Sequence, residues 1–86
     1  MDEHELRRAA RDKLERGELP RLSPERIWIN DGDGETCALC GRPISASETE
    51  YELQFALRPG RAAGDLVSFQ FHTSCHAVWQ AERVRS

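Results

Sequence analysis

The sequence predicts an α+β fold: a small domain of 86 residues in which a helix lies at each end of the chain and a β-hairpin between them. Apolar residues recur every three or four positions near both termini, which is typical of amphipathic helices. In the middle they alternate with polar residues, which is typical of a strand with one buried face. Three cysteines and a histidine form two closely spaced pairs, a pattern that favours a metal ion joining distant segments.

The first predicted element is an amphipathic helix over residues 2–16. Its apolar positions lie four apart, on one stripe of the helix: Leu6, Ala10 and Leu14. Gly17 provides a residue that can end the helix in a left-handed conformation, and Pro20 prevents it from resuming. We expect residues 1–22 to form this helix and a connector, packed as one compact unit with a metal-binding domain over residues 23–86.

The connector leads into short elements. Ser23 and Pro24 have the cap signature of a short helical turn over residues 23–26. Residues 27–29 read as a short apolar strand, in which Trp28 is expected to pack against the metal-binding part of the chain. The run of Asp and Gly over residues 30–34 predicts a turn.

The hairpin has the clearest pattern in the chain. Its first strand alternates Tyr51, Leu53, Phe55 and Leu57 with Glu50, Glu52, Gln54 and Ala56. A Gly- and Pro-rich turn over residues 58–65 precedes a second strand with Val67, Phe69 and Phe71 on one face. Three acidic residues are expected on the solvated face: Glu48, Glu50 and Glu52.

A final helix is predicted from Thr73 to about Val84. Cys75, Val78, Trp79 and Glu82 follow each other at intervals of three and four, so they share one face. Trp79 is expected to pack on the hairpin.

The two ligand pairs are Cys37-x2-Cys40, followed by Gly41, and His72-x2-Cys75. A Cys-x2-Cys pair presents two thiolates across one tight turn, and residues three apart on the first turn of a helix project to one side. We therefore predict one structural Zn²⁺ per chain, held by Cys37, Cys40, His72 and Cys75. His76 is the alternative to His72 as the fourth ligand.

Redox, disulfide or thiol chemistry are the competing interpretations of the cysteines. A redox Cys-x-x-Cys is expected within a βαβ pattern, which this sequence does not show. A disulfide framework favours an even number of cysteines and a secretory context, whereas this chain has three and begins with a strongly charged segment. The odd thiol therefore favours metal.

The order of two knuckle ligands, a hairpin, and two ligands at the start of a helix resembles a treble-clef zinc finger. More closely, Gly32-x-Gly34-x-x-Cys37-x-x-Cys40-Gly41-x-x-Ile44, Glu50-Tyr51-Glu52-Leu53 and Phe71-His72-x-x-Cys75-x-x-x-Trp79 resemble a group of short, functionally uncharacterised bacterial zinc-binding proteins. The chain is also similar in part to a LIM lobe, with a longer separation between ligand pairs and no second zinc site. The resemblance implies the same four ligands and a soluble, cytoplasmic zinc protein.

Composition narrows the function classes. The net charge of -3 and the pI near 5.6 disfavour a duplex-binding surface, and no apolar run is long enough to cross a membrane. Because four protein ligands leave no position for an activated water, we expect a non-enzymatic module that binds a protein partner or a second copy. The alternative is a nucleic-acid-binding zinc finger that uses Arg42, Arg58, Arg61, Arg83 and Arg85. An HNH-like nuclease, or a thiol enzyme built on Cys75 and His76, ranks below both.

Metal binding is expected to be coupled to folding. Structural Zn²⁺ contributes about 10–16 kcal/mol at neutral pH, whereas whole domains are typically stable by about 5–15 kcal/mol. We therefore expect residues 37–75 to be largely unfolded without the metal.

Overall fold

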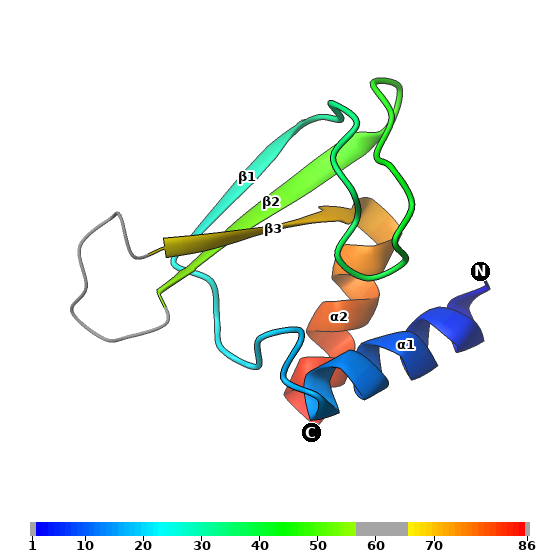
Figure 1. Ribbon diagram of the computed structural model, residues 1–86, viewed down its shortest axis with the longest axis vertical. Coiled ribbons are helices and arrows are strands. Elements are labelled where there is room, and N and C mark those ends of the chain that lie inside the picture. The colour runs from blue at the N-terminus through cyan, green and yellow to red at the C-terminus, as the bar shows by residue number, and fades with distance from the viewer. Residues whose placement is uncertain (1, 57–65, 86) are drawn as a thin grey trace.

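A computed structural model of the chain, which describes residues 2–56 and 66–85, contains two helices and a three-stranded antiparallel sheet (Figure 1). The predicted α+β class is confirmed. The elements in chain order are α1 (Glu3–Glu15), β1 (Arg26–Asp31), β2 (Thr49–Ala56), β3 (Leu66–His72) and α2 (Thr73–Arg85). The strands lie in the order β1-β2-β3, and the two helices lie together on one side of the sheet. No helix in the described ranges is long and apolar enough to span a bilayer.

Helix α1 forms as its pattern predicts. Asp2 caps its N-terminus by accepting a hydrogen bond from the Glu5 backbone N–H, and the Glu5 carboxylate accepts one from the Asp2 N–H in return. Gly17 follows the helix with a φ of 75°, the left-handed conformation that ends helices. The predicted stripe is buried, and it faces α2: Leu6, Ala10 and Leu14.

Strand β2 is the centre of the sheet, and its register fixes both faces. Leu53 pairs with Ile27 of β1 on one side and with Phe69 of β3 on the other. Because cross-strand partners point to the same face, odd-numbered residues of all three strands share the face that α2 covers. The alternation predicted for residues 50–56 and 67–71 is therefore confirmed, whereas Leu57 and the predicted turn over 58–65 lie outside the described residues.

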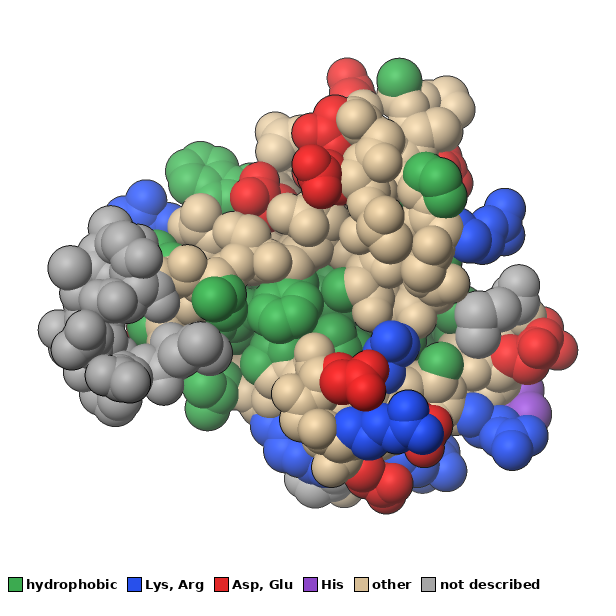
Figure 2. Space-filling model, in the orientation of Figure 1, with side chains coloured by type: hydrophobic (Ala, Val, Ile, Leu, Met, Phe, Trp, Pro, Cys, Tyr) green, Lys and Arg blue, Asp and Glu red, His purple; other side chains and the backbone are tan. Residues whose placement is uncertain are grey.

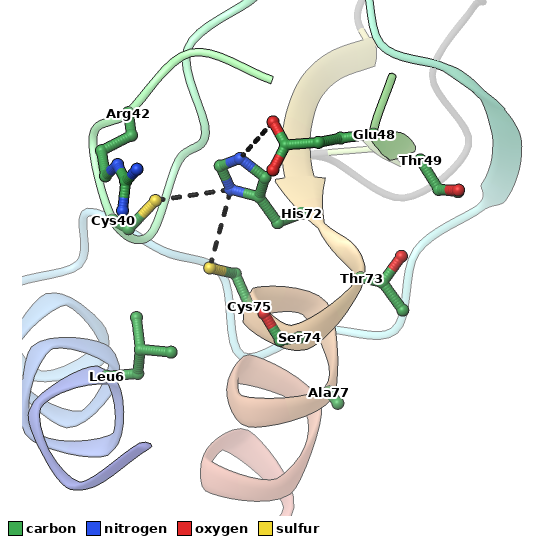
Figure 3. A pocket seen from close by; sticks show the side chains of 10 residues that line it. All are labelled: Leu6, Cys40, Arg42, Glu48, Thr49, His72, Thr73, Ser74, Cys75 and Ala77. Atoms are coloured by element: carbon green, nitrogen blue, oxygen red, sulfur yellow. Dashed lines mark hydrogen bonds and ion pairs between the residues drawn. The ribbon is translucent and has the colours of Figure 1, made fainter. Parts of the chain in front are cut away.

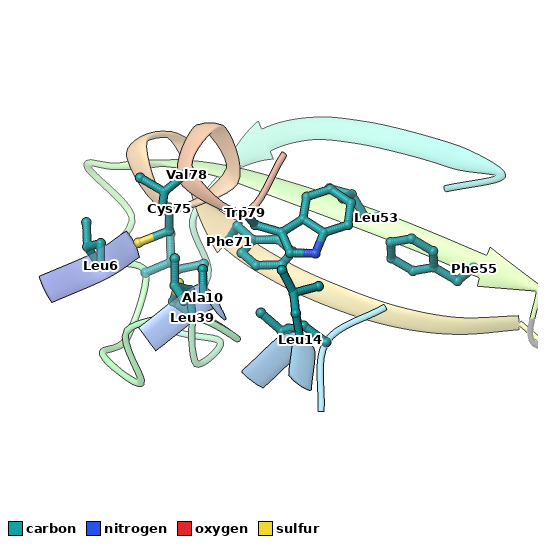
Figure 4. Packing of buried hydrophobic residues seen from close by; sticks show 13 residues of the cluster. Leu6, Ala10, Leu14, Leu39, Leu53, Phe55, Phe71, Cys75, Val78 and Trp79 are labelled. Carbon is teal, nitrogen blue, oxygen red and sulfur yellow. The ribbon is translucent and has the colours of Figure 1, made fainter. Parts of the chain in front are cut away.

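Trp79 of α2 is the largest fully buried side chain and lies at the middle of the core (Figure 4). Its ring stacks on Phe71 with 5.6 Å between centroids and meets the edge of Phe55 at 5.9 Å. The indole Nε1–H donates a hydrogen bond to the Pro20 carbonyl oxygen at 3.0 Å, so the connector after α1 is tied to the same residue. The prediction that Trp79 packs on the hairpin is confirmed.

Two predictions about the segment before β2 are wrong. Residues 23–26 form no helical turn: Arg26 begins β1, and the Glu25 N–H donates to the Gln54 carbonyl oxygen of β2, so pairing with the sheet overrides the local cap signature. The expected strand at 27–29 is present, but Trp28 does not pack in the core. It is 46% exposed because β1 is an edge strand and Trp28 lies on the face opposite the helices.

The prediction that Glu48, Glu50 and Glu52 lie on a solvated face is also partly wrong. Glu50 is only 4% exposed, since it lies in the central strand between Asn30 and His72 and interacts with Asp33 of the loop after β1. Its Oε1 atom has no hydrogen-bond partner among the described residues. Burial and the neighbouring Asp33 carboxylate raise the pKa of Glu50.

Candidate metal centre

The first ligand pair lies in a tight loop, residues 36–43, which we call the knuckle loop. Thr36 and Pro43 form a β-bridge at its base. Within it, the Cys37 N–H donates to the Arg42 carbonyl oxygen at 2.9 Å, and the Gly41 N–H donates to the Cys37 carbonyl oxygen at 3.0 Å. Gly41 has a φ of 78°, so a residue without a Cβ is favoured here, as its place after the Cys pair indicates.

The knuckle loop is anchored to the sheet by a backbone hydrogen bond, in which the Ala38 N–H donates to the Gln70 carbonyl oxygen of β3 at 2.7 Å. The segments that flank the loop also lie close together, because a Cβ at Gly32 would overlap the Ser45 carbonyl oxygen. These contacts hold the two cysteines beside the point where β3 ends.

The second ligand pair lies at the junction of two elements. His72 is the last residue of β3, and Cys75 lies in the first turn of α2. The His72 Nδ1 atom lies 3.4 Å from the Cys40 Sγ and 3.9 Å from the Cys75 Sγ (Figure 3). The ligand atoms of Cys37, Cys40, His72 and Cys75 all lie within 4.8 Å of one another, so these four residues could hold a metal ion.

The two separations from His72 Nδ1 are close to those of ligand atoms around a tetrahedral metal ion. Metal–sulfur and metal–nitrogen bonds of about 2.3 and 2.0–2.1 Å place tetrahedral ligand atoms roughly 3.5–3.8 Å apart. The contacts of 3.4 and 3.9 Å bracket that range. Other ligand atoms lie up to 4.8 Å apart, so they would have to approach one another by about 1 Å around such an ion.

The thiols of Cys37 and Cys75 affect each other's pKa. The hydrogen bond between these two side chains lowers the pKa of Cys37 and raises the pKa of Cys75, and burial also raises the pKa of Cys75. One thiolate thus forms readily and is stabilised by its neighbour's proton. A cation in the cluster replaces such protons, because thiolate is the form that binds metal.

A carboxylate that the sequence did not indicate completes the surroundings of His72. Glu48 Oε1 lies 3.5 Å from His72 Nε2, on the side of the ring away from the thiols (Figure 3). The same oxygen accepts a hydrogen bond from the Ser45 N–H at 2.9 Å, which fixes the carboxylate and is the first cause of its lowered pKa. A proton on Nε2 leaves Nδ1 as the lone-pair donor that faces the sulfurs. No spacing rule distinguishes Glu48 from Glu52, so only the fold reveals this contact.

His76 lies apart from the cluster. Its ring stacks on Tyr51 with 4.6 Å between centroids, on the face of the sheet that α2 covers. Burial, followed by the charge of Arg83, lowers the pKa of His76, which favours the neutral ring in this apolar setting. Of the two candidate histidines, His72 is therefore the one that meets the cysteines.

A hollow of about 560 Å³ opens beside the cluster. Cys40, His72 and Cys75 line it, together with Arg42 and Leu6, whereas Cys37 is buried and does not line it (Figure 3). A metal ion would therefore have one side toward this hollow and one toward the core. Comparisons with models of protein families, with curated proteins and with solved structures found no match for this chain.

Proposed function

We propose that Cys37, Cys40, His72 and Cys75 bind one structural Zn²⁺ ion. The observation that carries this proposal is the convergence of three sulfurs and one imidazole nitrogen within 4.8 Å. Soft thiolates with one imidazole in a tetrahedral arrangement suit zinc better than magnesium or calcium, which prefer oxygen ligands. Four protein ligands leave no position for an activated water, which supports a structural role.

The order of elements around the cluster supports a treble-clef-like architecture. A knuckle loop, the β2–β3 pair and the first turn of α2 follow one another and meet at the ligands. This chain adds β1 to the sheet and packs α1 against α2.

For the activity of the whole chain, we infer a non-enzymatic protein-interaction module. Support comes from β1, whose six residues are all exposed and include Ile27, Trp28 and Ile29. Large apolar side chains grouped on an edge strand mark a docking surface more often than an isolated exposed residue does. Figure 2 shows hydrophobic side chains at the surface beside β1.

Nucleic-acid binding has less support. Arg83 lies over the Trp79 ring at 5.1 Å and also contacts Gln80 and the Arg21 carbonyl oxygen, so it takes part in local packing. Arg58 and Arg61 lie outside the described residues. Acidic and basic side chains are intermixed over α1 in Figure 2, which weakens any basic field there.

The metal proposal is tested by elemental analysis and chelation of the full chain. We expect about one zinc per chain and a loss of native circular dichroism in excess chelator. Cys40→Ser should resemble the metal-free state, whereas the matched variant His76→Ala should keep the metal. In a Co²⁺-substituted sample, thiolate charge-transfer bands should report the sulfur ligands. Native structure in excess chelator, or metal lost in His76→Ala but kept in His72→Ala, contradicts the proposal.

The interaction proposal is tested by affinity capture from native lysate with the zinc-loaded protein. Bound proteins should be lost with Ile29→Lys and retained with Val84→Lys, because Val84 is an equally exposed apolar residue away from β1. A protein that captures nothing and stays monomeric at every concentration would refute an interaction role.

A further inference from the structure

Strand β1 is the open edge of the sheet. The other edge, β3, is partly used, because its Gln70 carbonyl oxygen accepts the hydrogen bond from the knuckle loop. Directly after β1, the Gly32 N–H donates a hydrogen bond to the Glu48 carbonyl oxygen, which continues the register that pairs Arg26 with Gln54. Since backbone groups alternate in direction along an antiparallel ladder, those of Ile27 and Ile29 point away from β2.

The side chains of this edge are apolar on both faces. Ile27 and Ile29 are 49% and 60% exposed on the helix-covered face, beyond the reach of the helices, and Trp28 is 46% exposed on the opposite face. Natural edge strands usually carry a charge or a proline that prevents pairing with another chain. Neither occurs in the four central residues of β1, 27–30; its charged residues are at its two ends, Arg26 and Asp31.

We propose that β1 pairs antiparallel with β1 of a second copy of this chain, so that two three-stranded sheets join into one six-stranded sheet. This inference rests on the interaction role proposed above and names its partner. The two-fold axis would run perpendicular to the sheet beside Trp28, which places Trp28 opposite the partner's Trp28. Ile27 then lies opposite the partner's Ile29, and the backbone groups that point outward face each other.

Self-complementarity is the reason to choose a second copy. Ile27 is the register partner of Leu53, and Ile29 is the register partner of Tyr51. In the paired sheet, one continuous apolar row would therefore cross the interface on the helix-covered face: Leu53, Ile27, the partner's Ile29 and the partner's Tyr51. Cross-strand apolar pairs of this kind are the units that stabilise sheets.

A parallel pair of β1 strands would align Arg26 with Arg26 and Asp31 with Asp31, so like charges disfavour it. In the proposed antiparallel register, Arg26 lies opposite the partner's Asn30 and Asp31 lies opposite the partner's Glu25, so the ends of the paired strands bring acidic residues together and weaken the dimer. A six-residue edge contributes less than the roughly 800 Å² per partner of a standard interface, so we expect a dimer with a Kd in the micromolar range or weaker.

The test uses sedimentation velocity of the zinc-loaded full chain from about 10 µM to about 1 mM, a range that spans the expected Kd. The unmodified chain should pass from monomer to dimer. Trp28→Glu and Trp28→Lys should each weaken the dimer at least about tenfold, because like charges would then face each other across the axis. Mixing the two variants should restore a dimer that contains one of each. Val84→Lys should dimerise as the unmodified chain does.

The outcomes distinguish pairing between two copies of the chain from the more general interaction role. A chain that stays monomeric throughout the range overturns the self-pairing; if it still captures other proteins through β1, the interaction role survives. Dimerisation unchanged in Trp28→Glu overturns the assignment of β1. Failure of the mixed variants to dimerise, with each still folded by circular dichroism and loaded with zinc, overturns the alignment of Trp28 on the axis.

Discussion

The contact between Glu48 and His72 predicts that a residue outside the ligand set controls metal affinity. Removing a hydrogen-bonding partner of a metal-binding histidine typically lowers affinity about 10–100-fold. Here the Glu48 Oε1–His72 Nε2 distance is 3.5 Å and the Glu48 side chain is 48% exposed, so water can replace part of the interaction. We therefore expect the lower end, about tenfold weaker zinc binding in Glu48→Ala. Glu48→Gln keeps an acceptor without the charge and should lose less.

The assay is a competition titration against a chromophoric chelator at neutral pH, with Glu52→Ala as the matched control from the same stretch of acidic residues. The Co²⁺ spectrum of Glu48→Ala should keep its thiolate charge-transfer bands, whereas its d–d bands should shift because the orientation of the imidazole changes. If Glu48→Ala binds zinc as tightly as the unmodified chain, or if Glu52→Ala weakens binding equally, then Glu48 does not orient His72.

Three further predictions concern stability, each measured by urea denaturation of the zinc-loaded chain. Leu14→Ala removes a side chain that is 3% exposed and should cost about 2–5 kcal/mol, whereas Leu22→Ala, at 53% exposed, should cost little. Gly32→Ala should destabilise the fold and loosen metal binding, because its Cβ would overlap the Ser45 carbonyl oxygen. Glu50→Gln should stabilise the chain by about 1 kcal/mol near pH 7. Because the pKa of Glu50 is raised in the folded state, its contribution to stability is fully present below the pKa of the unfolded chain, about 4.3, and is lost as pH rises through the pKa of the folded state. The gain in stability from Gln should therefore shrink toward acidic pH. An equal gain at acidic pH would contradict this interpretation.

Elements that depend on local periodicity could be predicted from the sequence. The stripe of Leu6, Ala10 and Leu14 lies on α1 as expected, and the alternation through Leu53 and Phe55 sets the buried face of β2. The convergence of the two ligand pairs also followed from spacing alone, because each pair is local and a hairpin brings them together.

Properties that depend on which element lies beside another could not be predicted. Trp28 has the size of a core residue, but its exposure depends on β1 being an edge strand, and strand order is not encoded in local periodicity. Glu50 and Glu52 occupy equivalent positions in the alternation, yet Glu50 is buried because Asp33 and the end of the sheet lie next to it. The cap signature at Ser23 failed for the same reason, since pairing of the following residues with β2 took precedence.

Helix α2 carries both a proposed metal ligand and the anchor of the N-terminal helix. Cys75 lies in its first turn, Trp79 one turn later holds the connector through Pro20, and Glu82 another turn on meets Arg11 of α1 at 3.3 Å. Because α1 packs against the same helix that carries Cys75, the two helices are expected to open together as one cooperative unit. Amide hydrogen exchange in α1 should therefore accelerate when the metal is withdrawn, although α1 contributes no ligand. The metal would then slow the opening of α1 as well as that of the segments that carry the proposed ligands.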